Sequence, residues 1–328
     1  MQVCLGGRRP QWMRETAVTI GNFDGVHLGH RHILQRLRQE ADSRGLQTAA
    51  VVFEPQPQEF FARCQGRALP YRLSPLRDKL ALLADSGCVD AVWVLRFNRS
   101  FAALGAEAFI RQVLQDGLHT RYLLVGDDFR FGAGRGGDFD LLQQQADFET
   151  AATPSVLVAD ERASSTAVRR ALAAGDLPQA AAVLGRDYAL SGRVKHGAKL
   201  GRTLGFPTAN IHLPPHHYAL SGVFVVRVED DDGRSWRGVA NFGSNPTVTV
   251  GGLQRLEVHL FDCREDLYGH RLRVIFLHKL REERRFDGLA ALQAQIEADA
   301  AAARVWQADA FEKPPAVDAV QGVAAQRA

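Results

Sequence analysis

The feature that most constrains the fold is a change in hydrophobic pattern near residue 184. Before it, short apolar runs alternate with stretches of helical periodicity, and the runs are AVTIGNF, TAAVVFEP, AVWVLRF (91–97), RYLLVGDDF (121–129) and SVLVAD (155–160). This alternation is typical of a parallel sheet with helices on both faces. The spacing of apolar residues predicts a helix from Leu28 up to Gly45, and further helices over LRDKLALLADSG and AEAFIRQVLQDG.

After Leu184 the apolar runs become short and are separated by Gly, Pro and Asp; they are YALSGRV, GFPTANIHL, GVFVVRV, WRGVANFG, LEVHLFD and LRVIFLHKL. This pattern predicts the antiparallel strands of a small barrel. The acidic run from Glu229 to Asp232, followed by Gly233, favours a hairpin turn over a metal site. An Ala-rich helix is expected from Asp287 to Trp306, packed against the barrel.

A chain of 328 residues is longer than one typical domain. We therefore expect a first domain over residues 1–186 and a second over 187–311. The remainder, 312–328, has two adjacent prolines near its start and no apolar periodicity, so a disordered tail is expected there.

Composition excludes several classes of function. The net charge is +3, and the 40 basic and 37 acidic side chains are interleaved, which gives little support for nucleic-acid binding. The four cysteines are far apart with no CxxC pair, so neither a zinc site nor a disulfide framework is indicated. No segment has the apolar length of a signal peptide or a membrane span. These observations favour a soluble protein of the reducing cytoplasm.

The segment GNFDGVHLGHRHIL follows a predicted strand and opens a predicted helix. Gly21, Gly25 and Gly29 lie around the strand end, and His27 and His30 fall in the first helical turn. Glycine lets a polyphosphate approach the backbone, and imidazole donors can stabilise charge that develops on an α-phosphate. Alone, the HxGH sequence fits equally well a glycine turn with an exposed pair of histidines.

Two further segments in this half suggest ligand contacts. In RASSTAVRRALAAG, Ser164 and Ser165 can cap a short helix whose first turn carries Thr166 and Arg169, which is a second candidate anion site. An ordinary Ser-capped helix is the commoner interpretation of such a segment. GDDFRFG (126–132) ends a predicted strand, where open α/β sheets bind ligands, although a tight acidic turn with buried phenylalanines would have the same sequence.

Taken in order, GNFDGVHLGH, VVFEPQPQEFF, GDDFRFG and SSTAVRRAL resemble the HxGH nucleotidyltransferases, and within them the FMN adenylyltransferase module of bacterial FAD synthetases. The resemblance covers most of residues 16–186 and implies a Rossmann-like α/β fold. It implies that His27 and His30 are catalytic and contact the ATP phosphates, and that Ser165, Thr166 and Arg169 hold the far phosphates. The complete set of ATP-binding residues that it implies is Gly21, Asn22, Phe23, Asp24, Gly25, His27, Gly29, His30, Ser165, Thr166 and Arg169.

For the flavin, the same resemblance implies contacts from Asp127, Asp128 and Phe131. Many relatives have a histidine at the position of Gln56, to which we therefore assign no catalytic role. No strong general base is expected in this domain. The phosphate of FMN is already anionic at neutral pH, so positioning and charge stabilisation suffice for its attack on the α-phosphate of ATP.

In the second half, GRVKHGAKLGRTLGFPTANI places several glycines ahead of Thr208 and Asn210. In an extended strand these two side chains share one face. A neutral hydroxyl and a neutral amide suit a Mg²⁺ ion whose charge is balanced mainly by ATP phosphates. Alone, the TAN sequence is more typical of a strand with its polar residues outward.

This stretch, together with GVANFGSNPTV, LEVHLFD and DLYGHRLRV, closely resembles the riboflavin kinase domain over residues 187–306. The resemblance implies a small antiparallel β-barrel with a C-terminal helix. It implies that Thr208 and Asn210 bind the metal of Mg-ATP and that Glu257 is the catalytic base, which a poorly nucleophilic ribityl hydroxyl requires. The ATP-binding residues implied here are Gly197, Gly201, Gly205, Thr208 and Asn210.

Histidines near this second candidate site have simpler interpretations. His259 lies two residues after Glu257 on the same strand face, and we interpret it as a packing or supporting residue. His216 and His217 follow two prolines without a third candidate ligand, which favours a loop over a metal site.

Together the two resemblances imply a transferase of FAD biosynthesis. It would phosphorylate riboflavin to FMN and then adenylylate FMN to FAD, releasing pyrophosphate, with ATP as co-substrate in both steps. The expected partners are riboflavin, FMN and ATP, without nucleic acid or membrane. Two alternatives stay open, a flavin-binding regulator without chemistry and a nucleotidyltransferase with another acceptor, such as a phosphopantetheine-type substrate.

Overall fold

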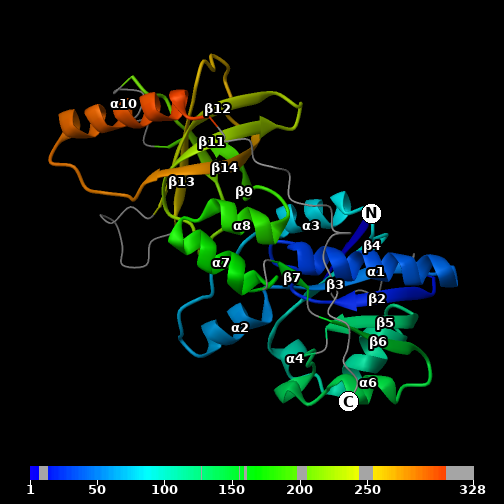
Figure 1. Ribbon diagram of the computed structural model, residues 1–328. Helices are drawn as coiled ribbons and strands as arrows, with labels where there is room; N and C mark the ends of the chain where they lie inside the picture. The colour runs from blue at the N-terminus through cyan, green and yellow to red at the C-terminus, as the bar shows by residue number, and fades with distance from the viewer. Residues whose placement is uncertain are drawn as a thin grey trace. The chain divides into compact units, whose positions relative to one another are not determined.

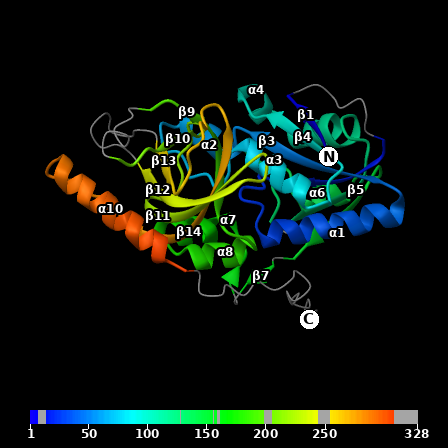
Figure 2. The same ribbon diagram turned by 90° about the horizontal axis from the view of Figure 1, so that it is seen from above.

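A computed structural model describes residues 1–6, 14–126, 128–154, 156–158, 161–197, 205–243 and 254–307. The described chain forms two compact units (Figures 1 and 2). The first contains the described residues of Met1–Pro70 and Lys79–Ala163, and the second contains Tyr71–Asp78 and the described residues between Ser164 and Gln307. The tail expected over 312–328 lies outside the described residues.

The first unit is built on a six-stranded sheet in the order β1-β4-β3-β2-β5-β6. Its strands are β1 (Gln2–Leu5), β2 (Thr16–Ile20), β3 (Gln47–Glu54), β4 (Ala91–Arg96), β5 (Thr120–Gly126) and β6 (Glu149–Thr153). Every neighbouring pair is parallel, which confirms the predicted sheet. All five residues of β2 are buried, because both faces of a central parallel strand are covered.

The two edge strands differ from the prediction. The apolar run at 155–160 was expected to join the sheet, and this was wrong. Its described part contains β7 (Leu157–Val158), which pairs antiparallel with β8 (Glu161–Arg162) in a separate two-stranded sheet. The edge positions belong instead to β1 and to β6, whose sequence ETAAT has no large apolar residue. An edge strand pairs on one side only, so a search for apolar runs does not detect it.

The helices of the first unit connect these strands. They are α1 (Leu28–Arg44), α2 (Pro57–Cys64), α3 (Leu76–Asp85), α4 (Arg99–Ala102), α5 (Ala106–Phe109), the π-helix η1 (Ile110–Gln115), the 3-10 helix η2 (Ala133–Arg135) and α6 (Phe139–Gln143). The first turn of α3 belongs to the Tyr71–Asp78 segment of the second unit. Helix α1 has the predicted bounds, because Gly45 ends it in the left-handed conformation with φ of 66°.

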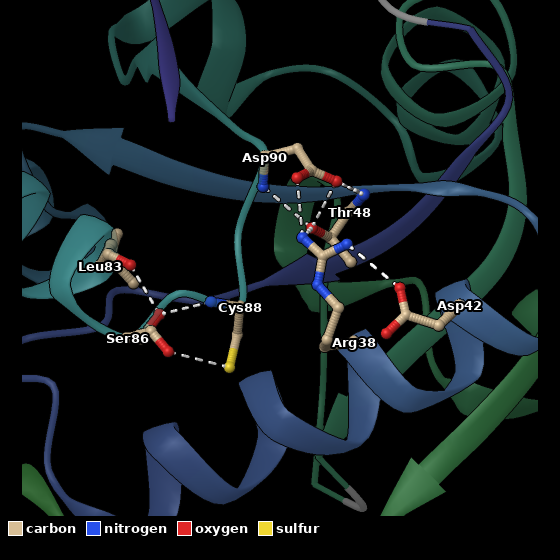
Figure 3. A network of polar contacts seen from close by, with 7 residues as sticks. All are labelled: Arg38, Asp42, Thr48, Leu83, Ser86, Cys88 and Asp90. Carbon is tan, nitrogen blue, oxygen red and sulfur yellow. Dashed lines mark hydrogen bonds and ion pairs between the residues drawn. The ribbon is translucent and has the colours of Figure 1, made fainter.

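A polar network fixes α1 against the sheet (Figure 3). The Arg38 guanidinium donates to Thr48 Oγ1 at 2.7 Å and to Asp90 Oδ1 at 2.8 Å, while the Thr48 amide donates to Asp90 Oδ2 at 2.9 Å. Burial by itself would raise the pKa of the Asp90 carboxyl, but the bonds from Arg38 and Thr48 outweigh it and hold this pKa below its ordinary value. The network therefore ties α1 to β3 and to the start of β4.

The second unit contains a closed antiparallel barrel, as predicted, and its strand order is β10-β13-β12-β11-β14-β9 (Figure 1). The strands are β9 (Ala189–Lys195), β10 (Ala209–His212), β11 (Gly222–Asp230), β12 (Ser235–Gly243), β13 (Arg255–Leu260) and β14 (Arg271–Arg281). Phe224, Phe242 and Phe276 are fully buried. The ring centroids of Phe224 and Phe242 lie 5.4 and 6.0 Å from that of Phe276. The predicted turn after β11 is confirmed, since Asp230 Oδ1 accepts from the amides of Asp232 and Arg234.

Three helices lie among the described residues of the barrel unit. They are α7 (Ser165–Ala174), α8 (Leu177–Leu184) and α10 (Leu289–Val305). The predicted packing of the last helix on the barrel is confirmed, because Ala300 and Ala303 share a buried cluster with Val225 and Phe261. Arg281 adds a bidentate ion pair to Asp299 of this helix. No helix in the described part of the chain is long and apolar enough to cross a membrane.

The segment Tyr71–Asp78 is joined to the rest of the barrel unit by hydrogen bonds. The Arg72 amide donates to the His217 carbonyl at 2.7 Å, and the Ser191 amide donates to Asp78 Oδ2 at 2.9 Å. Arg169 Nε of α7 donates to the Tyr71 carbonyl at 2.6 Å. The compact barrel unit thus includes residues from both sides of the boundary expected at 186/187.

Candidate functional sites

The first candidate site is the turn between β2 and α1. The backbone φ is 46° at Phe23, 80° at Gly25 and 40° at Val26, so the turn enters the left-handed region three times. Residues other than glycine rarely adopt this backbone conformation, because it is sterically strained. Strained backbone of this kind is concentrated at functional sites. Asp24, within the turn, is buried. The turn lies at the carboxyl end of a central parallel strand, where α/β sheets bind ligands.

The two histidines of this turn lie together at the start of α1. His27 is the N-cap residue, and its ring stacks on that of His30 with 3.7 Å between centroids. His30 also lies 5.0 Å from the ring of Phe23. The first turn of α1 contains no acidic side chain, so nothing on it opposes the positive end of the helix dipole. The arrangement can bind an anion with backbone amides and two imidazoles at once.

Gly29 packs closely against its neighbours in this arrangement. A Cβ atom at this position would lie 3.0 Å from the carbonyl oxygen of Ala163 and 3.1 Å from the ring of His27. Any side chain would therefore push the His27 ring away from its position. A Cβ atom added at Gly21 would similarly lie 3.2 Å from the ring of Phe23.

The other residues expected at this site are distributed as follows. Ser164 caps α7 by accepting a bond from the Ala167 amide at 3.1 Å, so the predicted cap is confirmed. Ser165 and Thr166 begin that helix, and Arg169 follows one turn later. These residues belong to the barrel unit, whereas His27 and His30 belong to the first unit.

The turn after β5 carries the residues expected at the flavin. Asp127 lies outside the described residues. Asp128 is exposed and 3.4 Å from Arg162. Phe131 is buried and packs on Phe109 and Phe129, with its backbone bonded to Gly137. Phe131 is thus part of the hydrophobic core, which agrees with the interpretation of this segment as a turn with buried phenylalanines.

The second candidate site is a row of polar residues across three barrel strands. In the register of the barrel, Glu257 on β13 lies directly opposite Asn210 on β10 and directly opposite Asn241 on β12. Directly opposed residues of antiparallel strands point to the same face, with Cβ atoms about 5 Å apart. Thr208 is the residue immediately before β10, and Asn210 is the second residue of that strand. The sequence did not single out Asn241, because alternation gives the face of a strand but not its partner.

Gly197 closes one side of this row. A Cβ atom there would lie 2.3 Å from Oδ1 of Asn210, so only glycine allows the amide its position. Gly205 has φ of 84°, which glycine adopts readily. Gly201 lies outside the described residues. Of the two described glycines, Gly197 is therefore the one that packs directly against Asn210.

The donor set of this row fits a Mg²⁺ ion that is carried by a nucleotide. Among the described residues, no group of three or more His, Cys, Asp or Glu side chains could hold a metal by itself. A hydroxyl, an amide oxygen and one carboxylate are the oxygen ligands that Mg²⁺ prefers. They are too few, and carry too little negative charge, to bind the ion without other ligands. Such a site needs phosphate oxygens to complete it.

In the comparisons with known proteins, two family models match successive parts of the chain. The family model for FAD synthetase matches residues 9–167, and the model for riboflavin kinase matches residues 184–307. The chain thus combines a flavin nucleotidyltransferase part and a flavin kinase part, which makes it a two-site transferase acting on flavins.

Two similar curated relatives carry both parts in one chain, as their descriptions state. The bifunctional riboflavin kinase/FMN adenylyltransferase of Pseudomonas fluorescens is 49% identical over 303 residues, which cover 92% of this chain and 95% of that one. The protein of the same description from Escherichia coli K12 is 49% identical over 290 residues, covering 88% and 91%. This chain belongs to the family of bifunctional riboflavin kinase/FMN adenylyltransferases.

A solved structure has a similar fold over nearly the whole chain. It is a crystal structure described as that of a macrolide-efflux protein from Streptococcus pneumoniae, with a TM-score of 0.77 and 27% sequence identity. The similarity covers 94% of this chain and 100% of that one.

Proposed function

We propose that the two activities of this transferase are divided between the two candidate sites. Riboflavin is phosphorylated to FMN at the polar row of the barrel, and FMN is adenylylated to FAD at the turn before α1, with ATP as co-substrate in each step. The functional boundary is placed near residue 186, between a nucleotidyltransferase domain (1–186) and a kinase domain (187–311). The observation that carries the assignment is the alignment of Asn210 and Glu257 in directly opposite positions.

In the kinase step, Glu257 acts as the general base. A ribityl hydroxyl is a weak nucleophile at neutral pH, so a carboxylate that accepts its proton during attack lowers the barrier. Thr208 and Asn210 would hold Mg²⁺ on the ATP phosphates, with Gly197, Gly201 and Gly205 in the covering loop. When bound, this ion supplies compensation of the phosphate charge.

In the adenylyltransferase step, His27 and His30 donate hydrogen bonds to the phosphates of ATP. Their rings lie face to face at the positive end of α1, so both can reach one anionic group. Gly21, Asn22, Phe23, Asp24, Gly25 and Gly29 form the surrounding turn. Ser165, Thr166 and Arg169 are assigned to the far phosphates, because a serine-capped helix start and a guanidinium both favour anions.

The flavin is assigned to the turn after β5, with contacts from Asp127, Asp128 and Phe131. This turn follows the carboxyl end of a strand that is the neighbour of β2 in the sheet. Phe131 would act from the core side by supporting the partly buried Phe129. The cytoplasm is the proposed location, since the four cysteines are widely spaced as in proteins of reducing compartments.

Reciprocal variants test the division of labour. In Glu257→Gln, the formation of FMN from riboflavin and Mg-ATP should fall at least about a hundredfold, while added FMN is still converted to FAD. In His30→Ala, FMN should form normally and accumulate, because a donor to the nucleotidyl group worth about 3 kcal/mol is lost. Chromatographic separation of the flavins gives the first rate in a reaction with riboflavin and Mg-ATP and the second rate in a reaction with added FMN and Mg-ATP.

The outcome also decides between the proposal and its alternatives. Near-normal FMN formation by Glu257→Gln would remove this residue from the role of base. FAD synthesis at the wild-type rate by His30→Ala would make the histidine turn purely structural. A protein that binds flavins and converts none of them would be a flavin-binding regulator.

A further inference from the structure

His259 occupies a position on β13 that the kinase assignment does not use. It follows Glu257 by two residues and therefore points to the same face of the strand. Its Nδ1 atom lies 2.9 Å from the carbonyl oxygen of Pro207. A carbonyl oxygen can only accept, so Nδ1 carries the proton and donates.

This hydrogen bond fixes the peptide plane that leads into Thr208. The carbonyl of Pro207 and the Cα of Thr208 belong to one planar peptide group. A hydrogen bond that orients the carbonyl therefore also fixes the position of this Cα. The proline ring restricts the backbone on the other side. Strand pairing of β10 begins only at Ala209. The bond from His259 thus holds Thr208 from the side that the strand ladder does not reach.

The His259 ring is itself held in place by its aromatic neighbours. Phe206 and Phe261 contact it edge to face, at 5.3 and 5.8 Å between centroids. Both phenylalanines pack into the cluster beneath α10 that contains Ala300 and Ala303. Edge-to-face contacts of this kind restrict the rotation of a ring. The Nδ1 donor is therefore aimed at Pro207 by packing that reaches the last helix.

We propose that His259 is a positioning residue of the kinase reaction, which sets the Thr208–Asn210 segment for Mg-ATP through the Pro207 carbonyl. This inference rests on the proposed role of Thr208 and Asn210. Without the bond, the Pro207–Thr208 peptide plane turns and the nucleotide ligands lose their arrangement. Affinity for Mg-ATP then falls, whereas proton acceptance by Glu257 is untouched.

Two substitutions in the full chain separate the donor from the ring. His259→Asn places an amide N–H near the position of Nδ1, and His259→Phe keeps the aromatic contacts without a donor. The loss of one such hydrogen bond corresponds to a change of about tenfold. We expect His259→Phe to raise the KM for Mg-ATP in FMN formation about tenfold with little change in kcat, and His259→Asn to restore it. FAD synthesis from added FMN should be unchanged in both.

A measurement without turnover complements these kinetics. The ¹⁵N spectrum of the wild-type protein should show His259 with a protonated Nδ1, before and after Mg-ATP is added. An unprotonated Nδ1, an unchanged KM in His259→Phe, or an Asn variant as impaired as the Phe variant would each overturn the proposal.

Thr208→Ala distinguishes the failure of this inference from the failure of the proposed site. If Thr208→Ala raises the KM for Mg-ATP and His259→Phe does not, the positioning role is wrong and the nucleotide site stands. If neither variant changes this KM, both assignments are wrong.

Discussion

Replacing Gly197 with alanine tests whether the kinase step depends on the position of the Asn210 amide. The added Cβ would lie 2.3 Å from Oδ1 and 2.4 Å from Cγ of Asn210. Non-bonded heavy atoms approach to about 3.5 Å, so the amide must move by more than about 1 Å. A misplacement of about 1 Å at a reacting centre costs about a hundredfold in rate. We therefore expect Gly197→Ala to form FMN about a hundredfold more slowly than the wild type.

The assay supplies riboflavin and Mg-ATP in one reaction and FMN and Mg-ATP in another, and resolves the flavins by chromatography. FAD synthesis from added FMN should keep its wild-type rate, because the three atoms nearest to the added Cβ all belong to Asn210, which has no assigned role in that step. The matched control is Gly105→Ala. Gly105 has φ of −64° and no atom within 4 Å of the added Cβ, so neither activity should change.

Two results would refute this reasoning. FMN formation at the wild-type rate in Gly197→Ala would mean that the position of Asn210 does not limit the kinase step. An equal loss of both activities would mean that the substitution acts on the whole chain rather than on the contact with Asn210.

Three further predictions concern other parts of the molecule. Gly29→Ala should slow FAD synthesis and leave FMN formation intact, because its Cβ would press on the His27 ring at 3.1 Å; unchanged FAD synthesis would contradict this. Asp90→Asn should lower stability in urea unfolding at pH 7 by at most about 1 kcal/mol, since the pair with Arg38 is partly exposed to water. The pKa of Asp90 is lowered in the folded protein, so its contribution is present above the unfolded value near 4 and is lost as the pH falls through the folded value. The difference between wild type and variant should therefore shrink in acid, and a difference that grows there would be contrary. A fragment over 164–311 should melt at a higher temperature than one over 187–311, because α8 buries Leu177, Val183 and Leu184. Both fragments should make FMN and no FAD. Equal melting temperatures would show that α8 adds nothing to the stability of the barrel.

Local sequence signals predicted most of the regular structure. The bounds of α1 followed from the spacing of its apolar residues and from Gly45, which ends it. All six barrel strands and the turn at Asp230 were also predicted, because alternation and turn residues act over a few neighbouring positions. The edge strands β1 and β6 were not, since an edge strand needs no apolar run.

The sequence by itself also determined which residue types the two sites contain. The tertiary structure alone decided how they meet. The register of β10, β12 and β13 sets Asn210, Glu257 and Asn241 in one row, and nothing within any one strand specifies that register. The inclusion of Tyr71–Asp78 in the barrel unit was likewise decided by the tertiary structure alone. These features depend on contacts between residues far apart along the chain, which short-range patterns do not encode.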